Sequence, residues 1–170
     1  MKTERPKRKP NRIPRYDYST TGAYFVTVCA KNHRCIFWDT VGATNGRPPT
    51  PNLSLYGMIV DRAIGNIPEY YPAVSVDHYV VMPNHVHLLL QIHTDSHGRP
   101  LVAPTIQTVI QQWKGVVTKQ IGQSVWQKSF HDHVIRNETD YKMIWQYIDT
   151  NPVRWKNDCL YRAEQTQTTG

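Results

Sequence analysis

The stretch from Val76 to His93, VDHYVVMPNHVHLLLQIH, constrains the fold more than any other part of the chain. Two runs rich in β-branched and apolar residues flank Met82-Pro83-Asn84. Proline and asparagine are turn residues, because proline presets φ and asparagine hydrogen-bonds its own backbone. The pattern therefore predicts a β-hairpin whose second strand begins next to this turn.

The second strand of the hairpin carries two sets of side chains, because successive residues of a strand point to opposite faces. One set is expected to enter a core: Val86, Leu88, Leu90 and Ile92. The other set points the opposite way: His85, His87, Leu89, Gln91 and His93. Two imidazoles at i and i+2 are spaced to bind one metal ion. A bare His-x-His pair also occurs on the wet face of half-buried sheets, and two histidines do not complete a metal site.

The chain length and composition indicate one folded domain. A chain of 170 residues is long enough for a substantial core. No apolar run reaches membrane-spanning length and no apolar segment follows the N-terminal charges, so a cytoplasmic protein without membrane contact is expected. The three cysteines, Cys29, Cys35 and Cys159, lack metal-site spacing and are expected to be reduced thiols.

Basic residues are concentrated at the N-terminus. The formal net charge is +7, and most of it comes from residues 1–15, where Glu4 is the only acidic residue. We expect 1–15 to be a disordered basic arm that binds a polyanion, or alternatively a solubilising tail. The folded domain is expected at 16–155, followed by a polar C-terminal tail at 156–170.

The remaining patterns predict the order of elements. They indicate a first strand at 23–30, which 34–38 could extend or pair with, a helix at 55–70 and hairpin strands at 74–82 and 85–93. A helix at 105–121 and an extended segment at 125–135 follow. Asn137 is expected to cap a last helix that ends before Pro152 and carries the apolar stripe Tyr141, Ile144, Trp145 and Ile148. The first six elements match the ferredoxin-like βαββαβ arrangement, an antiparallel sheet with two helices on one face. The extra C-terminal helix is then expected to pack on the rest of the sheet.

The last predicted helix carries two polar residues on one face. Tyr147 and Asn151 are four residues apart, beside the apolar stripe of Ile144 and Ile148. Singly, such a tyrosine is most often a core residue, and an asparagine before proline most often terminates a helix. Together they could supply a hydroxyl nucleophile and an amide-oxygen ligand. An oxygen donor with two imidazoles suits Mg²⁺ or Mn²⁺ better than structural zinc.

Several of these segments resemble one family. Residues 82–89, MPNHVHLL, resemble the HUH motif (His, hydrophobic, His) of single-tyrosine DNA transposases. Residues 132–138 and 147–152 resemble the family's tyrosine helix and its approach, and residues 24–27 resemble its first strand. The similarity covers roughly residues 15 to 155. Within the family, the chain looks closest to the transposases associated with repetitive extragenic palindromes (REP).

The resemblance implies a role for each site residue. His85 and His87 match the histidines that bind a divalent metal, Asn151 stands where the family has a third ligand, and Tyr147 matches the nucleophile. The implied protein is a metal-dependent single-stranded DNA endonuclease and strand-transferase that forms a 5′-phosphotyrosine. Its implied partner is single-stranded or hairpin DNA with palindromic repeats, which would place it with the nucleoid.

Four other tyrosines are rivals for the nucleophile, and eight basic residues are candidate DNA contacts. The competing tyrosines are Tyr70, Tyr71, Tyr79 and Tyr141. The candidate DNA contacts are Lys7, Arg8, Lys9, Arg12, Arg15, Lys114, Arg136 and Arg154. A solvated helix face explains Lys114 equally well.

Two other functions and two oligomeric states remain open from sequence. The first alternative is a metal-dependent nuclease that uses water as nucleophile, with Tyr147 as a packing residue. The second is a domesticated protein that binds DNA hairpins without cleaving them. The chain lacks an obvious dimer strand, which favours a monomer. The alternative is a dimer that exchanges the tyrosine helix, as in insertion-sequence relatives.

Overall fold

The computed structural model describes residues 21–39, 52–93 and 104–161. The predicted basic arm, with Lys7, Arg8, Lys9, Arg12 and Arg15, lies outside the described residues, as does the end of the predicted C-terminal tail. Their predicted roles therefore stay predictions.

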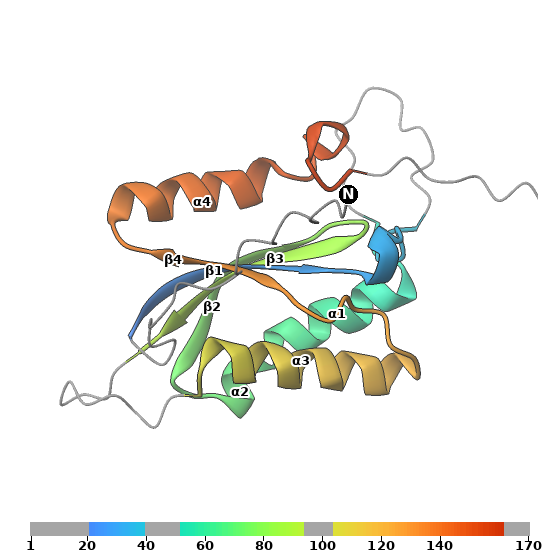
Figure 1. The fold of residues 1–170 in the computed structure, drawn as a ribbon, viewed down its shortest axis with the longest axis horizontal. Helices are drawn as coiled ribbons and strands as arrows, with labels where there is room; N and C mark the ends of the chain where they lie inside the picture. Colours follow the sequence, from blue (N-terminus) through green and yellow to red (C-terminus); the bar gives the residue numbers. More distant parts are fainter. Residues whose placement is uncertain (1–20, 40–51, 94–103, 162–170) are drawn as a thin grey trace, which may run out of the picture.

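The fold is an antiparallel sheet with helices on both faces. Its strands are β1 (Gly22–Cys29), β2 (Val74–Val81), β3 (His85–Ile92) and β4 (His131–Ile135), in the order β2-β3-β1-β4. The helices α1 (Leu55–Gly65), α2 (Ile67–Tyr70) and α3 (Ile106–Ile121) cover one face, and α4 (Glu138–Thr150) covers the other (Figure 1). The predicted ferredoxin-like α+β fold with an extra C-terminal helix is confirmed.

The larger core lies between the sheet and α1 to α3. The predicted inward set of β3 is buried there, with Leu88 and Leu90 fully enclosed. The helix α3 begins at its cap Thr105, whose side chain accepts a hydrogen bond from the Thr108 amide. It ends at Gly122, where a φ of 84° requires the left-handed conformation that glycine adopts most easily. Local sequence signals and burial therefore agree on this helix.

A second, smaller core lies between the sheet and α4. Asn137 caps α4 as predicted, by accepting a hydrogen bond from the Asp140 amide at 2.8 Å. Leu89 of β3 packs against Ile144 and Ile148 of α4, and all three are buried. Trp145, also assigned to the apolar stripe, is 37% exposed. Because α4 covers this face, β3 is buried on both sides rather than facing water on one.

The predicted helix at 55–70 is two helices. Asn66 separates α1 from α2, and Pro68 lies in the first turn of α2. Proline has no amide proton, and its ring clashes with the carbonyl four residues earlier, so a continuous helix through Pro68 is strongly disfavoured. Periodicity alone did not reveal this break.

The two extended segments predicted around the sheet are shorter than expected. Within 125–135 only β4 is a strand, and Trp126 forms an isolated bridge with Ala30. The segment 34–38 contributes one bridge, between Trp38 and Leu53. A 3₁₀ turn, η1 (Lys31–His33), ends the path of β1 instead. Among the described residues, no helix combines the length and the apolar composition needed to cross a membrane.

Two glycine substitutions test the packing of the larger core. A side chain at Gly57 would overlap the backbone carbonyl of Phe37, whereas Gly115, exposed within α3, has open space. We expect Gly57→Ala to lower the free energy of unfolding by about 2 kcal/mol, because the helix must shift. We expect Gly115→Ala to raise it by up to about 1 kcal/mol, because alanine favours the helix. Urea unfolding measures both, and an unchanged stability of Gly57→Ala would contradict the close approach.

Candidate metal and tyrosine site

The two histidines of the hairpin meet beneath α4. His85 is fully buried and His87 is 3% exposed, and their Nε2 atoms are 3.0 Å apart. The Phe25 ring stacks on His87 with 5.1 Å between centroids, and the Tyr147 ring lies edge-on to His87 at 5.2 Å. The pair is therefore enclosed by aromatic side chains, and the wet-face alternative for His-x-His is wrong.

Neighbouring polar groups fix the orientation of both rings. Asn84 donates from Nδ2 to the carbonyls of His33 and Leu160, at 3.3 and 2.8 Å, so its Oδ1 faces His85 as an acceptor. His85 Nδ1 then donates to this oxygen at 2.8 Å, which leaves Nε2 unprotonated and facing His87 Nε2 at 3.0 Å. On the neighbouring strand, Thr27 pairs with His87 and its hydroxyl contacts His87 Nδ1 at 2.8 Å. Metal-binding histidines are typically held by such hydrogen bonds to the other ring nitrogen.

Burial keeps both imidazoles neutral. Burial lowers the pKa of His85 to about 4, against a smaller opposing effect of Asp158 and with a further decrease from His33. Burial, and then the neighbouring His85, holds the pKa of His87 well below its ordinary value. A neutral imidazole with a free lone pair is the form that ligates metals.

Two oxygen-bearing residues, Asn151 and Asp158, line a cavity beside Tyr147. Asn151 is 3% exposed, and its Oδ1 accepts no hydrogen bond within the described part of the chain. Asp158 Oδ2 lies 3.9 Å from His85 Nε2. One ligand atom each from His85, His87 and Asp158 lies within 4.8 Å of the others. A buried amide oxygen without a partner is costly unless something binds it. The donor set therefore fits a hard divalent cation with mixed nitrogen and oxygen ligands.

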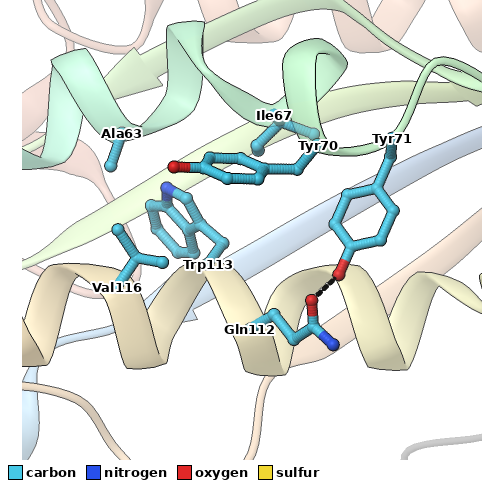
Figure 2. Close-up of a pocket in the computed structure, with 7 residues that line it drawn as sticks. All are labelled: Ala63, Ile67, Tyr70, Tyr71, Gln112, Trp113 and Val116. Atoms are coloured by element: carbon cyan, nitrogen blue, oxygen red, sulfur yellow. Dashed lines mark hydrogen bonds between the residues drawn. The ribbon is translucent and has the colours of Figure 1, made fainter.

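Of the five candidate tyrosines compared from sequence, all of which the structure describes, Tyr147 is the one that contacts the histidine pair. Its hydroxyl donates to Asp158 Oδ2 at 3.5 Å, and its side chain is 41% exposed. Burial and then the Asp158 carboxylate raise its pKa, while the Asn151 side chain lowers it. Three rival tyrosines are engaged elsewhere: Tyr71 with Gln112, Tyr79 with Asp61 and Tyr141 with Asp77. Tyr70, the fourth, lies on the helical layer across the sheet (Figure 2).

A cavity of about 420 Å³ lies beside Tyr147 and is lined mainly by polar residues. We call it the polar cavity. Its lining residues are Tyr147, Thr150, Asn151, Arg154, Asn157, Asp158 and Cys159. A second cavity, of about 160 Å³, lies between α1, α2 and α3 on the opposite face of the sheet. Figure 2 shows that mainly apolar side chains line it, with the Tyr71–Gln112 hydrogen bond at one side. Two residues of the polar cavity lie against the histidine pair, Tyr147 against His87 and Asp158 against His85.

The three predicted DNA contacts that the structure describes lie in different environments. Arg154 is exposed and lines the polar cavity. Arg136 is exposed just before α4. Lys114 is half-buried on α3, where its ammonium donates to the carbonyls of Gln127 and Lys128 at 2.7 and 3.3 Å. Burial lowers its pKa. Lys114 therefore holds the segment before β4, on the face of the sheet away from the histidines (Figure 1).

Three neighbours of the histidines were not singled out from sequence. Asn84 was assigned only to the turn, and Thr27 only to a strand. Asp158 was placed in the polar tail, yet its side chain is 3% exposed, and Leu160 packs back to accept the hydrogen bond from Asn84. The position of Asn84 next to His85 in the sequence could have indicated that it contacts this histidine. No local pattern indicates the same for Asp158, because its approach to the histidines depends on the turn η2 (Trp155–Asn157) that follows α4.

Comparison with known proteins gives the family. No family model matches the chain. A Haemophilus influenzae protein of unassigned function is 31% identical over a 173-residue alignment that spans 91% of this chain and 93% of that protein. A second protein from H. influenzae, named as a REP-associated tyrosine transposase, is 26% identical over 94 residues, 51% of this chain and 53% of that protein.

A solved structure shares the fold. It is a REP-associated tyrosine transposase bound to a REP hairpin, and it superposes with a TM-score of 0.62 and 24% sequence identity over 84% of this chain and 73% of that chain. The chain belongs to one family with the full-length Haemophilus relative. The resemblance to the REP-associated tyrosine transposases, inferred above from the motifs, is confirmed.

The buried histidines predict how stability depends on pH. His85 has a pKa of about 4 when folded and about 6.5 when unfolded, so between these values the unfolded chain binds a proton that the folded protein does not. His85 should therefore lower the free energy of unfolding of metal-free protein by about 3 kcal/mol as pH decreases from about 6.5 to about 4, and the buried His87 should add to this decrease. Urea unfolding in EDTA at several pH values measures this. His85→Gln should reduce the slope, whereas the exposed His131→Gln should not. An unchanged slope in His85→Gln would contradict the assignment.

Proposed function

We propose that the chain is a transposase-family enzyme that cleaves and rejoins single-stranded DNA through a 5′-phosphotyrosine intermediate and depends on a divalent metal. One observation carries the proposal. Tyr147, Asn151 and Asp158 line one polar cavity, and within the described residues the Asn151 Oδ1 accepts no hydrogen bond. Tyr147 and Asp158 also lie against the two neutral imidazoles, whose Nε2 atoms are 3.0 Å apart. The relatives named as transposases support the same class of DNA-processing enzyme.

His85, His87 and Asn151 would hold the metal, with Mg²⁺ or Mn²⁺ fitting the donor set best. When bound, the metal polarises the scissile phosphate and offsets the charge that develops on its oxygens. Asn84 and Thr27 contribute by orienting the imidazoles before DNA arrives. This preorganisation lowers the cost of assembling the site during the reaction.

Tyr147 would be the nucleophile. Its raised pKa means that the phenol must lose its proton during attack, and Asp158 Oδ2, at 3.5 Å, is the acceptor that faces it. The phenolic oxygen bonds to phosphorus as the bond to the 3′-oxygen breaks. The proton passes from Asp158 to the departing oxygen, leaving a 5′-phosphotyrosine and a free 3′-hydroxyl. Attack by a 3′-hydroxyl on the phosphotyrosine reverses the step and rejoins strands.

The proposed substrate is DNA with a palindromic hairpin and an unpaired flank. The relative of shared fold was solved bound to a REP hairpin. Arg154, which lines the cavity with Tyr147, would contact a phosphate of the cleaved strand, and the exposed Arg136 just before α4 would add a second contact. The basic arm at 1–15 would add sequence-independent contacts to the backbone.

A monomer is sufficient for this chemistry. Tyr147 on α4 reaches the histidine pair of its own chain, so a single copy contains the nucleophile and the proposed ligands. This supports the monomer expected from sequence over a dimer that exchanges α4. The rival in which water attacks and Tyr147 only packs gains less support, because the Tyr147 side chain is 41% exposed and its hydroxyl faces a carboxylate.

Covalent capture of DNA tests the proposal. Wild type, Tyr147→Phe and Tyr70→Phe would each be incubated with Mn²⁺ and a labelled single-stranded oligonucleotide carrying a palindrome, then separated on a denaturing protein gel. We expect a labelled protein band for wild type and Tyr70→Phe, its loss in Tyr147→Phe, and its loss in EDTA. Tyr70 is the matched control because it is exposed across the sheet from the site.

The other outcomes separate the rivals. Cleavage without any labelled protein, retained in Tyr147→Phe, would overturn the covalent mechanism in favour of a water-using nuclease. Hairpin binding with no cleavage in Mg²⁺ or Mn²⁺, across a panel of palindromes, would instead indicate a binding protein that does not cut.

A further inference from the structure

The edge strand β2 contains a β-bulge opposite α4. Its pairing with β3 shifts between Val76 and His78, so Asp77 has no partner residue in β3. Val76 pairs with Leu90, which faces the larger core, and His78 pairs with Leu89, which faces α4. In a regular strand Asp77 and His78 would point to opposite faces. The extra residue of a bulge removes this alternation, so both side chains point toward α4.

Both residues contact α4 directly. Asp77 Oδ2 accepts a hydrogen bond from the Tyr141 hydroxyl at 2.9 Å. His78 Nε2 lies 2.6 Å from Asp149 Oδ1, two residues after Tyr147. The His78 ring also stacks on Trp145, with 4.3 Å between centroids and 14° between planes. We call these the β2–α4 contacts, and they lie on both sides of Tyr147 along the helix.

The apolar cluster beneath α4 is smaller than the main core. Its buried members are Leu89, Ile144 and Ile148, and the partly buried residues packed against them are Ala23, Phe25, Val80, Ile135 and Tyr141. In the described part of the chain, α4 is the only long helix on its face of the sheet (Figure 1). Because the hydrophobic effect is non-directional, apolar burial alone does not specify the rotation and register of the helix. Directional polar contacts at the sheet edge can fix both.

We propose that Asp77 and His78 are positioning residues for Tyr147, presented to α4 by the bulge in β2. They set the rotation and register of α4, and thereby the distance from the Tyr147 hydroxyl to the histidine pair. The inference rests on the proposed tyrosine mechanism for its catalytic consequence, while the docking of α4 can be measured without DNA. A misplacement of about 1 Å at a reacting group can cost roughly a hundredfold in rate.

A general role in stability is the competing explanation. The His78–Asp149 pair has side chains that are 24% and 54% exposed, and partly exposed ion pairs contribute little to global stability. Positioning therefore predicts a large change in the rate of tyrosine attack with little change in unfolding. A stability role predicts that rate and stability change together.

The test compares His78→Ala, His78→Gln and Glu138→Ala. Glu138 is the matched control because its ion pair with Lys142, at 2.6 Å, lies within α4 and does not reach the sheet. Glutamine at position 78 keeps an N–H donor for Asp149. The measurements are the single-turnover rate of adduct formation at saturating hairpin DNA with Mn²⁺, the DNA dissociation constant, and hydrogen exchange of α4 and α3 amides.

We expect His78→Ala to lower the rate by about ten- to a hundredfold while the dissociation constant changes by less than about threefold. His78→Gln should restore most of the rate, and Glu138→Ala should match wild type. Amides of α4, but not of α3, should exchange faster in His78→Ala. An unchanged rate in His78→Ala, an equal loss in Glu138→Ala, or α4 exchange identical to wild type would each overturn the proposal.

The two proposals fail in different ways. If wild type forms no adduct on any hairpin while α4 exchange responds to His78→Ala as expected, the tyrosine mechanism fails and the docking role of His78 stands without its catalytic consequence. If wild type forms the adduct and His78→Ala forms it equally fast, the positioning role alone is overturned.

Discussion

The arrangement depends on one buried hydrogen bond, from His85 Nδ1 to Asn84 Oδ1. An imidazole buried without a partner would be costly, and a charged one more so. Asn84 accepts the ring proton at 2.8 Å while its own amide donates to two backbone carbonyls, so His85 is neutral, oriented and satisfied. This leaves Nε2 turned toward His87. The same turn residue that reverses the chain between β2 and β3 therefore also orients His85, the first proposed metal ligand. Burial of this pair in turn requires a cover over the face of β3 that α1 to α3 leave open, and α4 with the following turn supplies it.

The site combines two structural parts with different rigidity. The histidines stand on the central strand β3, paired on both sides, where displacement would disrupt the whole sheet. Tyr147, the proposed nucleophile, lies on α4, which rests on a small apolar cluster and on polar contacts from an edge strand. The rigid strand β3 would hold the metal ligands, while the more adjustable helix α4 carries the tyrosine. This division suits a reaction in which one tyrosine must attack DNA and then release it. The bulge in β2 is the feature that relates the two parts, because it belongs to the sheet and contacts the helix.

Much of this arrangement could be predicted from local patterns. The alternation along β3 identified the buried set around Leu88 and Leu90, and the Asn137 cap placed the start of α4. The features that could not be predicted from sequence depend on contacts between distant segments or on irregular backbone. The break at Pro68 was hidden by continuous periodicity, and the bulge at Asp77 leaves no signature in a run such as VSVDHYVV. Asp158 lies in a polar segment, and only the turn after α4 brings its carboxylate to the histidines. Lys114 looked like a solvated or DNA-facing cation, yet it binds the backbone before β4.

The central claim is that His85 and His87 are metal ligands rather than a hydrogen-bonded pair. Crystals grown with Mn²⁺ and examined by anomalous diffraction test it directly. The account predicts one anomalous peak within about 2.3 Å of both Nε2 atoms and close to Asn151 Oδ1, and its loss in crystals of His87→Ala. The absence of a peak between the histidines at saturating Mn²⁺, with their Nε2 atoms still 3.0 Å apart and Asn151 Oδ1 still without a partner, would contradict it.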